Sequence, residues 1–149
     1  VYSIKHQQTA NNHFIQTGGA TIASATDQRH TASGIAWKFV ISSINRGVLN
    51  PVELRLARRV VQNGVAFNVA IWTRRNSTNI TGALCIRGGQ VKGVPDDVTV
   101  TTAPSIDTWT QSSTLTITPT EDGVVEVSFL AWNADSTDRS LWIDDITFP

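Results

Sequence analysis

The stretch Val52-Glu-Leu-Arg-Leu-Ala-Arg-Arg-Val-Val-Gln-Asn-Gly-Val-Ala-Phe-Asn-Val-Ala-Ile-Trp-Thr73 decides the fold, because apolar and polar residues alternate on both sides of Asn63-Gly64. A period of two is typical of half-buried strands. An Asn-Gly pair tolerates the positive φ angles that a tight hairpin turn needs. We therefore expect strands at 52–61 and 65–73, joined as a hairpin.

The same alternation continues through the chain on both sides of this hairpin. Further strands are expected at 35–42, 80–87, 98–102, 109–118, 124–132 and 141–148. Turn residues, among them Gly88-Gly89 and Pro95, separate these strands at intervals of about 8–12 residues. About eight strands at this spacing indicate an all-β protein, an antiparallel β-sandwich of jelly-roll type.

The N-terminal stretch differs from the rest, because residues 1–31 are polar and show little periodicity. We expect an irregular N-terminal arm there, with one or two short strands, and a single sandwich domain over residues 32–149. The chain begins with Val1 and contains no methionine. We therefore expect a processed protein or a segment of a longer chain.

The composition agrees with a strand-rich domain. Of 149 residues, 19 are Thr, 15 Val and 13 Ile, whereas Leu, Glu and Lys together number 13. β-branched residues favour strands, and strong helix formers are scarce. No apolar run approaches the roughly 18 residues of a membrane span, so no membrane partner is expected. A single cysteine cannot form a disulfide within the chain.

The net charge of zero is a cancellation along the sequence. Residues 1–93 hold 11 Lys and Arg against Asp27 and Glu53, a net charge of +9. Residues 94–149 hold Arg139 against 10 acidic residues, a net charge of −9. If early and late strands alternate in the sandwich, these charges pair internally; otherwise the fold has a basic and an acidic flank.

Two segments near the C-terminus suggest a family. Residues 123–132 (Gly-Val-Val-Glu-Val-Ser-Phe-Leu-Ala-Trp) and 141–148 (Leu-Trp-Ile-Asp-Asp-Ile-Thr-Phe), together with residues 31–39, resemble strands of carbohydrate-binding-module-like jelly rolls. Residues 80–93 and 117–126 are similar to jelly-roll modules in structural proteins of tailed-bacteriophage virions, such as fibres, tails and capsid-associated proteins. The resemblance covers most of residues 31–148 and implies fold more than function.

Strand phase separates the tryptophans. Trp37 shares a face with Phe39 and Ile41, so we expect it in the core. Trp72 and Trp132 each lie on the side of their strand opposite its apolar residues, and so point away from the core. A platform for a sugar ring would combine these two indoles with their polar neighbours Asn68, Arg74 and Glu126. Alternatively, the two tryptophans cover a sheet edge, lie under a loop or fill a subunit interface.

Asp144-Asp145 is the candidate metal site. Adjacent residues on a strand face opposite ways, so we expect one of the two carboxylates to join any given site. The family resemblance implies a structural calcium held by an Asp at this place together with N-terminal residues. The alternative is that the pair hydrogen-bonds a neighbouring loop or meets an arginine. No other cofactor is expected.

Four arginines, Arg55, Arg58, Arg59 and Arg75, are candidate interface residues that would meet carboxylates within the sandwich or across a subunit boundary. Nucleic acid is not favoured as a partner, because acidic strands pack into the same small sandwich. Cys85 is expected to be a small buried hydrophobe. No catalytic residues can be nominated, and we expect no enzymatic activity.

Two functions remain open at the level of sequence. The first is a non-enzymatic structural or interaction module assembled on a larger body, a phage virion component such as a fibre, tail or capsid decoration, with other subunits or copies of itself as partners. The second is a carbohydrate-binding module that attaches a virion or a secreted enzyme to glycans. Either function places the protein in a virion or outside the cell.

Overall fold

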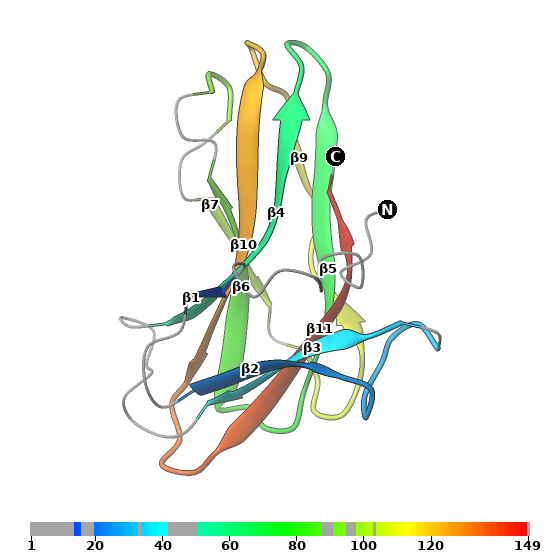
Figure 1. Cartoon of the computed structure of the whole chain (residues 1–149), viewed down its shortest axis with the longest axis vertical. Helices are drawn as coiled ribbons and strands as arrows, with labels where there is room; N and C mark the ends of the chain where they lie inside the picture. The colour runs from blue at the N-terminus through cyan, green and yellow to red at the C-terminus, as the bar shows by residue number, and fades with distance from the viewer. Residues whose placement is uncertain are drawn as a thin grey trace.

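The computed structural model describes residues 14–15, 20–32, 34–41, 51–87, 91–94, 98–102 and 104–148, which form two antiparallel sheets packed face to face (Figure 1). Sheet one runs in the order β1 (Phe14–Ile15), β4 (Val52–Val61), β10 (Gly123–Asn133), β6 (Ile80–Arg87) and β7 (Val98–Thr102). Sheet two runs in the order β2 (Ala20–Ala25), β3 (Ala36–Ile41), β11 (Arg139–Thr147), β5 (Phe67–Arg75) and β8 (Thr110–Gln111), and β9 (Leu115–Ile117) also pairs with β5.

The predicted all-β sandwich is confirmed. The described residues form eleven strands, of which eight have five or more residues; β1, β8 and β9 have two, two and three. The strand expected at 109–118 is divided into β8 and β9, where Ser112 bonds the backbone of Ile71. The described residues contain no helix, and so none that could cross a membrane. The predicted turns at Gly88-Gly89 and Pro95 lie outside the described residues.

The core fills the space between the two sheets. Its largest fully buried side chains include Phe129 of β10 and Phe39 of β3, whose ring centroids are 5.5 Å apart. These residues come from the apolar phase of each alternating strand, as a half-buried sheet requires. Trp37, expected in the core, packs against it but is only partly buried, and its indole Nε1 has no hydrogen-bond partner in the described part of the chain.

The hairpin predicted at Asn63-Gly64 is wrong in one respect. The turn forms, with a φ of 74° at Gly64 and a bond from the N–H of Val65 to the carbonyl of Gln62. However, β4 belongs to sheet one and β5 to sheet two, so the turn crosses between the sheets. The inner faces of the two strands meet through side chains in the core instead of through backbone bonds. Alternation alone cannot distinguish a hairpin within one sheet from a turn that crosses between two sheets.

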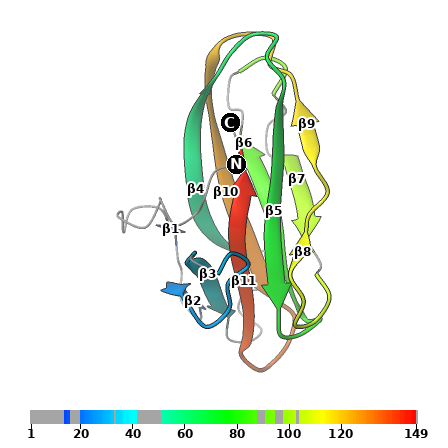
Figure 2. The same ribbon diagram turned by 90° about the vertical axis from the view of Figure 1, so that its right-hand side faces the viewer.

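Part of the predicted arm belongs to the sheets. β1 pairs with β4 at the edge of sheet one, and β2 pairs along the full length of β3 at the edge of sheet two. The prediction of one or two short strands before residue 32 is therefore confirmed. Residues 1–13 and 16–19 lie outside the described residues. After β2, the described residues 26–32 and 34, here called the segment 26–34, leave the edge and cross the outer face of sheet two (Figure 2).

Gly82 is required where β6 approaches β10. A Cβ at this position would lie 2.3 Å from Cζ of Phe129 and 2.8 Å from the carbonyl oxygen of Leu130. We expect Gly82→Ala to lower the free energy of unfolding by about 1–3 kcal/mol, because the core is already fully packed. Chemical denaturation measures this loss.

The double variant Gly82→Ala/Phe129→Leu provides the control. Shortening the side chain at residue 129 removes the contact with the phenyl ring, so the two substitutions together should cost less than the sum of their separate effects. Additive effects, or an unchanged stability of Gly82→Ala, would contradict the close approach.

Candidate functional site

The outward-facing tryptophans lie on opposite faces of the sandwich. In β5, Phe67, Val69 and Ile71 are buried in the core, so the alternate residues, which include Trp72, point outward from sheet two. In β10 the alternate residues, which include Trp132, point outward from sheet one. The predicted platform therefore divides: Trp72, Asn68 and Arg74 lie on one face, and Trp132 and Glu126 on the other.

On sheet two, the segment 26–34 covers Trp72. The ring of His30 stacks on the indole of Trp72, with centroids 3.9 Å apart and planes inclined by 17°, and Trp109 contacts His30 edge-on at 5.8 Å. One face of the Trp72 indole is thus occupied by a residue of the same chain. This is the predicted alternative in which the tryptophan lies under a loop.

The same segment is fixed at Asp27. Its carboxylate accepts a bond from Nζ of Lys38 at 2.9 Å and another from the indole Nε1 of Trp142 at 3.2 Å. Nζ of Lys38 also lies 4.9 Å from the centre of the Trp142 ring, within cation–π distance. Trp142 is nearly buried as a result. The large aromatic side chains of β5 and β11 on this face therefore hold a loop.

Asp144 and Asp145 hold the other end of the segment. The Asp144 carboxylate is buried and accepts bonds from the backbone N–H groups of His30 at 3.0 Å and Asp145 at 2.8 Å. The Asp145 carboxylate lies 2.7 Å from Nδ1 of His30 and accepts a bond from the hydroxyl of Thr31. Burial raises the pKa of the Asp144 carboxyl, and the charge of Asp145 adds to this effect.

The expectation that only one of the two aspartates could join a site is wrong. Asp145 has a φ of 41°, and the pairing of β11 with β5 is irregular between Asp144 and Thr147. This interruption breaks the alternation of side chains, and both carboxylates reach the same loop. The sequence Asp-Asp gives no sign of the irregularity.

The arrangement does not fit a calcium cage. Calcium takes about six to eight oxygen ligands, whereas the oxygens of Asp144 are directed at backbone N–H groups. In the described part of the chain, no three His, Cys, Asp or Glu side chains gather as a metal site. The contacts are those of the alternative, in which the pair hydrogen-bonds a neighbouring loop, and a calcium ion stays a prediction from the sequence.

The outer face of sheet one, here called the Trp132 face, consists of the outward side chains of β10, β4 and β6. Along β10 these are Glu126, Ser128, Leu130 and Trp132. Trp132 is partly exposed and lies opposite Thr81 of β6, and among the described residues it has no ring or cation partner. Its indole therefore lacks the stacked ring that His30 places on Trp72.

The middle of the Trp132 face is made of short side chains. Ala83 and Cys85 of β6 and Ser128 of β10 are almost fully buried although they point outward. The register places Arg55 beside Ser128, and Leu130 beside Ala83, so longer side chains surround the short ones. Among the described residues the hydroxyl of Ser128 has no hydrogen-bond partner. Cys85 is buried, as expected, and does not contact His30, which lies on the other sheet.

Charged groups flank the other end of the Trp132 face. Glu126 lies 3.5 Å from Nε of Arg55 and 4.0 Å from Nε of Arg58. Arg55 and Arg58 are exposed, with 46% and 73% of their side chains accessible, whereas Glu126 is 20% accessible. Two arginines thus share one carboxylate at distances longer than a good hydrogen bond.

The two other predicted interface arginines have structural contacts. Nη1 of Arg59 donates to the carbonyl of Arg58 at 2.8 Å. Arg75 is buried, and its Nη1 donates to the carbonyl of Ile80 at 3.1 Å and approaches the hydroxyl of Thr81 at 3.3 Å. Burial lowers the pKa of Arg75. Arg75 therefore closes the turn between β5 and β6 and is not an exposed interface residue.

Arg74 and Asn68, the polar neighbours of Trp72, are also engaged. The guanidinium of Arg74 bonds the backbone and carboxylate of Asp107, the latter at 3.2 Å. The amide oxygen of Asn68 accepts a bond from the hydroxyl of Thr116 at 2.7 Å. Neither side chain reaches Trp132, since the core lies between them.

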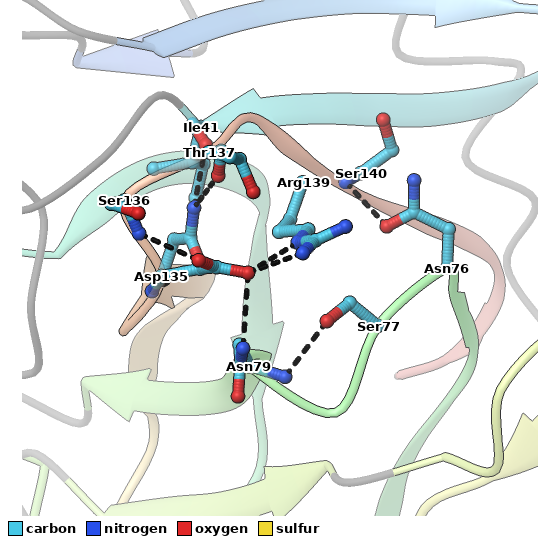
Figure 3. A network of polar contacts seen from close by, with 10 residues as sticks. Ile41, Asn76, Ser77, Asn79, Asp135, Ser136, Thr137, Arg139 and Ser140 are labelled. Atoms are coloured by element: carbon cyan, nitrogen blue, oxygen red, sulfur yellow. Dashed lines mark hydrogen bonds and ion pairs between the residues drawn. The ribbon is translucent and has the colours of Figure 1, made fainter.

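A polar network supports the strand end that carries Trp132 (Figure 3). The carboxylate of Asp135 accepts bonds from the amide of Asn79 at 3.0 Å and from Nε of Arg139 at 2.7 Å. The buried amide of Asn133 donates to the carbonyl of Ile41 at 2.9 Å. The bond from Asn79, followed by Arg139, lowers the pKa of Asp135. The network fixes the turn that follows Trp132.

A separate hollow near the turn between β4 and β5 has a volume of about 220 Å³ and is lined by Val60, Val61, Gln62, Val65 and Phe67. Its lining is mostly apolar, with Gln62 as the polar residue. A sugar requires several fixed donors and acceptors, so this hollow does not suit one.

Comparison with known proteins identifies the fold. No family model and no curated protein matches the chain. Among solved structures, TmCBM61 in complex with β-1,4-galactotriose has a TM-score of 0.54 and 17% identity, over 87% of this chain and 80% of that one. The xylan-binding CBM22-1 domain of Paenibacillus barcinonensis Xyn10C has a TM-score of 0.54 and 11% identity, over 97% and 88%.

The fold is the jelly roll of these carbohydrate-binding modules. The enzymatically active domain of bacteriophage CBA120 tailspike protein 4 has a TM-score of 0.59 and 12% identity, over 91% of this chain but 18% of that one. The resemblances stated from sequence are thus matched in structure. At such identities the likeness concerns the fold and assigns no residue a role.

Removing the Asp144 carboxylate tests its role as a loop anchor. We expect Asp144→Ala to lower the free energy of unfolding by about 1–3 kcal/mol, because backbone N–H groups lose a buried acceptor. Hydrogen exchange at the amides of His30 and Thr31 should become faster. Asp138→Ala, which removes an exposed carboxylate elsewhere, is the control; unchanged exchange in Asp144→Ala would contradict the anchor.

Asp135 should contribute to the stability at neutral pH and not in acid. Its pKa is lower in the folded chain, so the folded state favours the carboxylate, and this stabilisation is lost as the pH falls below the ordinary value near 4. We expect Asp135→Asn to be less stable than the parent at pH 7, with a smaller difference at pH 2–3. Thermal melts of the parent and of Asp135→Asn between pH 2 and pH 7 measure this difference in stability.

Asp138→Asn is the matched control, because it removes an exposed carboxylate from the same turn. An equal pH dependence of the two variants would argue against a specific role of Asp135.

Proposed function

We propose that the chain is a non-enzymatic carbohydrate-binding module and that its ligand binds on the Trp132 face. The observation that carries the proposal is the available indole of Trp132 on the outer side of a jelly-roll sheet. The C–H face of a sugar ring stacks on an indole, and its hydroxyls need fixed donors and acceptors beside the ring. Next to Trp132 the face offers Thr81 of β6. Further along the face it offers Glu126 of β10 and Arg55 of β4.

The fold likeness supports this function over the alternatives. Two of the similar solved structures carry names that refer to galactotriose and xylan binding. A virion role has narrower support, since it draws on the likeness to a phage tailspike domain of which the chain spans 18%. The two functions are compatible, because a glycan-binding module would attach a particle or a secreted enzyme to its target outside the cell.

The sheet-two face is a poorer site for a glycan. His30 already stacks on Trp72, and the segment 26–34 crosses the strands around it. A ligand would have to displace the bonds of Asp144 and Asp145 to reach that indole. The two tryptophans are therefore expected to differ in role, and each serves as the control for the other.

We expect Trp132→Ala to lower glycan affinity at least about tenfold and to leave the melting temperature almost unchanged, since its indole is partly exposed and makes no ring contact. Trp72→Ala should retain the affinity but lose about 1–3 kcal/mol of stability, because it removes a stacked pair. A glycan array followed by titration calorimetry, with thermal melts of both variants, measures these effects.

Two results would contradict the proposal. An array on which the parent protein binds no neutral or acidic glycan would overturn the function. Full affinity in Trp132→Ala would overturn the site, even if the function holds.

A further inference from the structure

The Trp132 face carries its aromatic and its charged groups at opposite ends of one strand. Trp132 and Glu126 are six residues apart on β10, which corresponds to about 20 Å along a strand. Arg58 lies opposite Glu126 in the register, and Arg55 lies opposite Ser128, so both arginines flank the end of β10 away from the indole. A glycan chain lying along β10 would reach both ends.

Among the described residues, the charge at the arginine end is not balanced by carboxylates. Arg55 and Arg58 share the single carboxylate of Glu126, and both contacts involve Nε. In the described part of the chain the terminal Nη groups of these arginines make no hydrogen bond, and both side chains are exposed. Glu53, the other carboxylate of this face, lies opposite Leu130 towards the Trp132 end and already has a partner.

A guanidinium with free Nη groups binds carboxylate and sulfate oxygens as a two-pronged donor. Neutral sugar hydroxyls use only part of this capacity and leave the excess positive charge unpaired. We propose that the module recognises an anionic glycan: a neutral ring stacks on Trp132, and a carboxylate or sulfate on a ring further along the chain binds between Arg55 and Arg58. This inference rests on the proposed function and adds the class of ligand.

The test compares each glycan with an uncharged form of the same chain. One arm uses oligogalacturonate and its methyl ester, and the other uses oligomeric dextran sulfate and dextran, so that carboxylate and sulfate are distinguished. We expect the anionic member of at least one pair to bind about tenfold more tightly at low salt, and the preference to shrink as the ionic strength rises. This comparison uses the unmodified protein and needs no variant.

Arg55→Gln/Arg58→Gln should abolish the preference, so that the charged and the uncharged chain bind with equal affinity. Arg29→Gln is the matched control, because it removes the same kind of charge from the exposed surface of the segment 26–34 on the other face. Its preference for the anionic chain should equal that of the parent. Titration calorimetry gives each affinity, and thermal melts confirm that the variants fold.

The outcomes distinguish a failure of the anionic-ligand inference from a failure of the proposed function. Equal binding of charged and uncharged chains, with binding still dependent on Trp132, would overturn the anionic ligand and leave the proposed function in place. Absence of binding to all four chains and to a glycan array would overturn both. A single-stranded DNA oligonucleotide that binds as tightly as the anionic glycan, and is lost in Arg55→Gln/Arg58→Gln, would indicate a general polyanion surface and overturn the inference.

Discussion

The structure depends on the burial of two sheet faces against each other, with Phe129 of β10 and Phe39 of β3 among the residues at the contact. Because side chains alternate along a strand, fixing the inner face also fixes every outward residue. Trp132 and Glu126 face outward because Phe129 and Val127 face inward. The chemistry on each outer face is therefore a consequence of core packing, and a shift of one residue in β10 would exchange the two sets.

The two outer faces of the sandwich differ in what covers them. Sheet two is covered by the chain's own segment 26–34, which is bound through Asp27 at one end and Asp144 and Asp145 at the other. Sheet one retains an available indole and two exposed arginines. A protein surface that places an aromatic ring and two guanidinium groups sharing one carboxylate on the same face is suited to a ligand with both an apolar ring face and a negative charge.

In the folded chain, basic residues from the first part of the sequence largely pair with acidic residues from the last part. Of six Lys or Arg ion pairs among the described residues, four join a basic residue before position 94 to a carboxylate after it. Late strands lie beside early ones, as β10 lies beside β4, so the charges cancel locally. Exposed pairs of this kind contribute only about 0–1 kcal/mol each. Their main effect is on where charge lies on the surface. Arg55 and Arg58 share the single carboxylate of Glu126, so positive charge is in excess there.

The sequence by itself determined the class of fold, most strand positions and the outward direction of Trp72 and Trp132, because all three follow from a local period of two. Only the tertiary structure decided that Trp72 and Trp132 lie on opposite faces, because the pairing of β5 with β11 and of β10 with β4 and β6 is non-local. The crossing at Asn63-Gly64 and the irregular backbone at Asp145 were likewise hidden, since each depends on which distant strand or loop the residues contact.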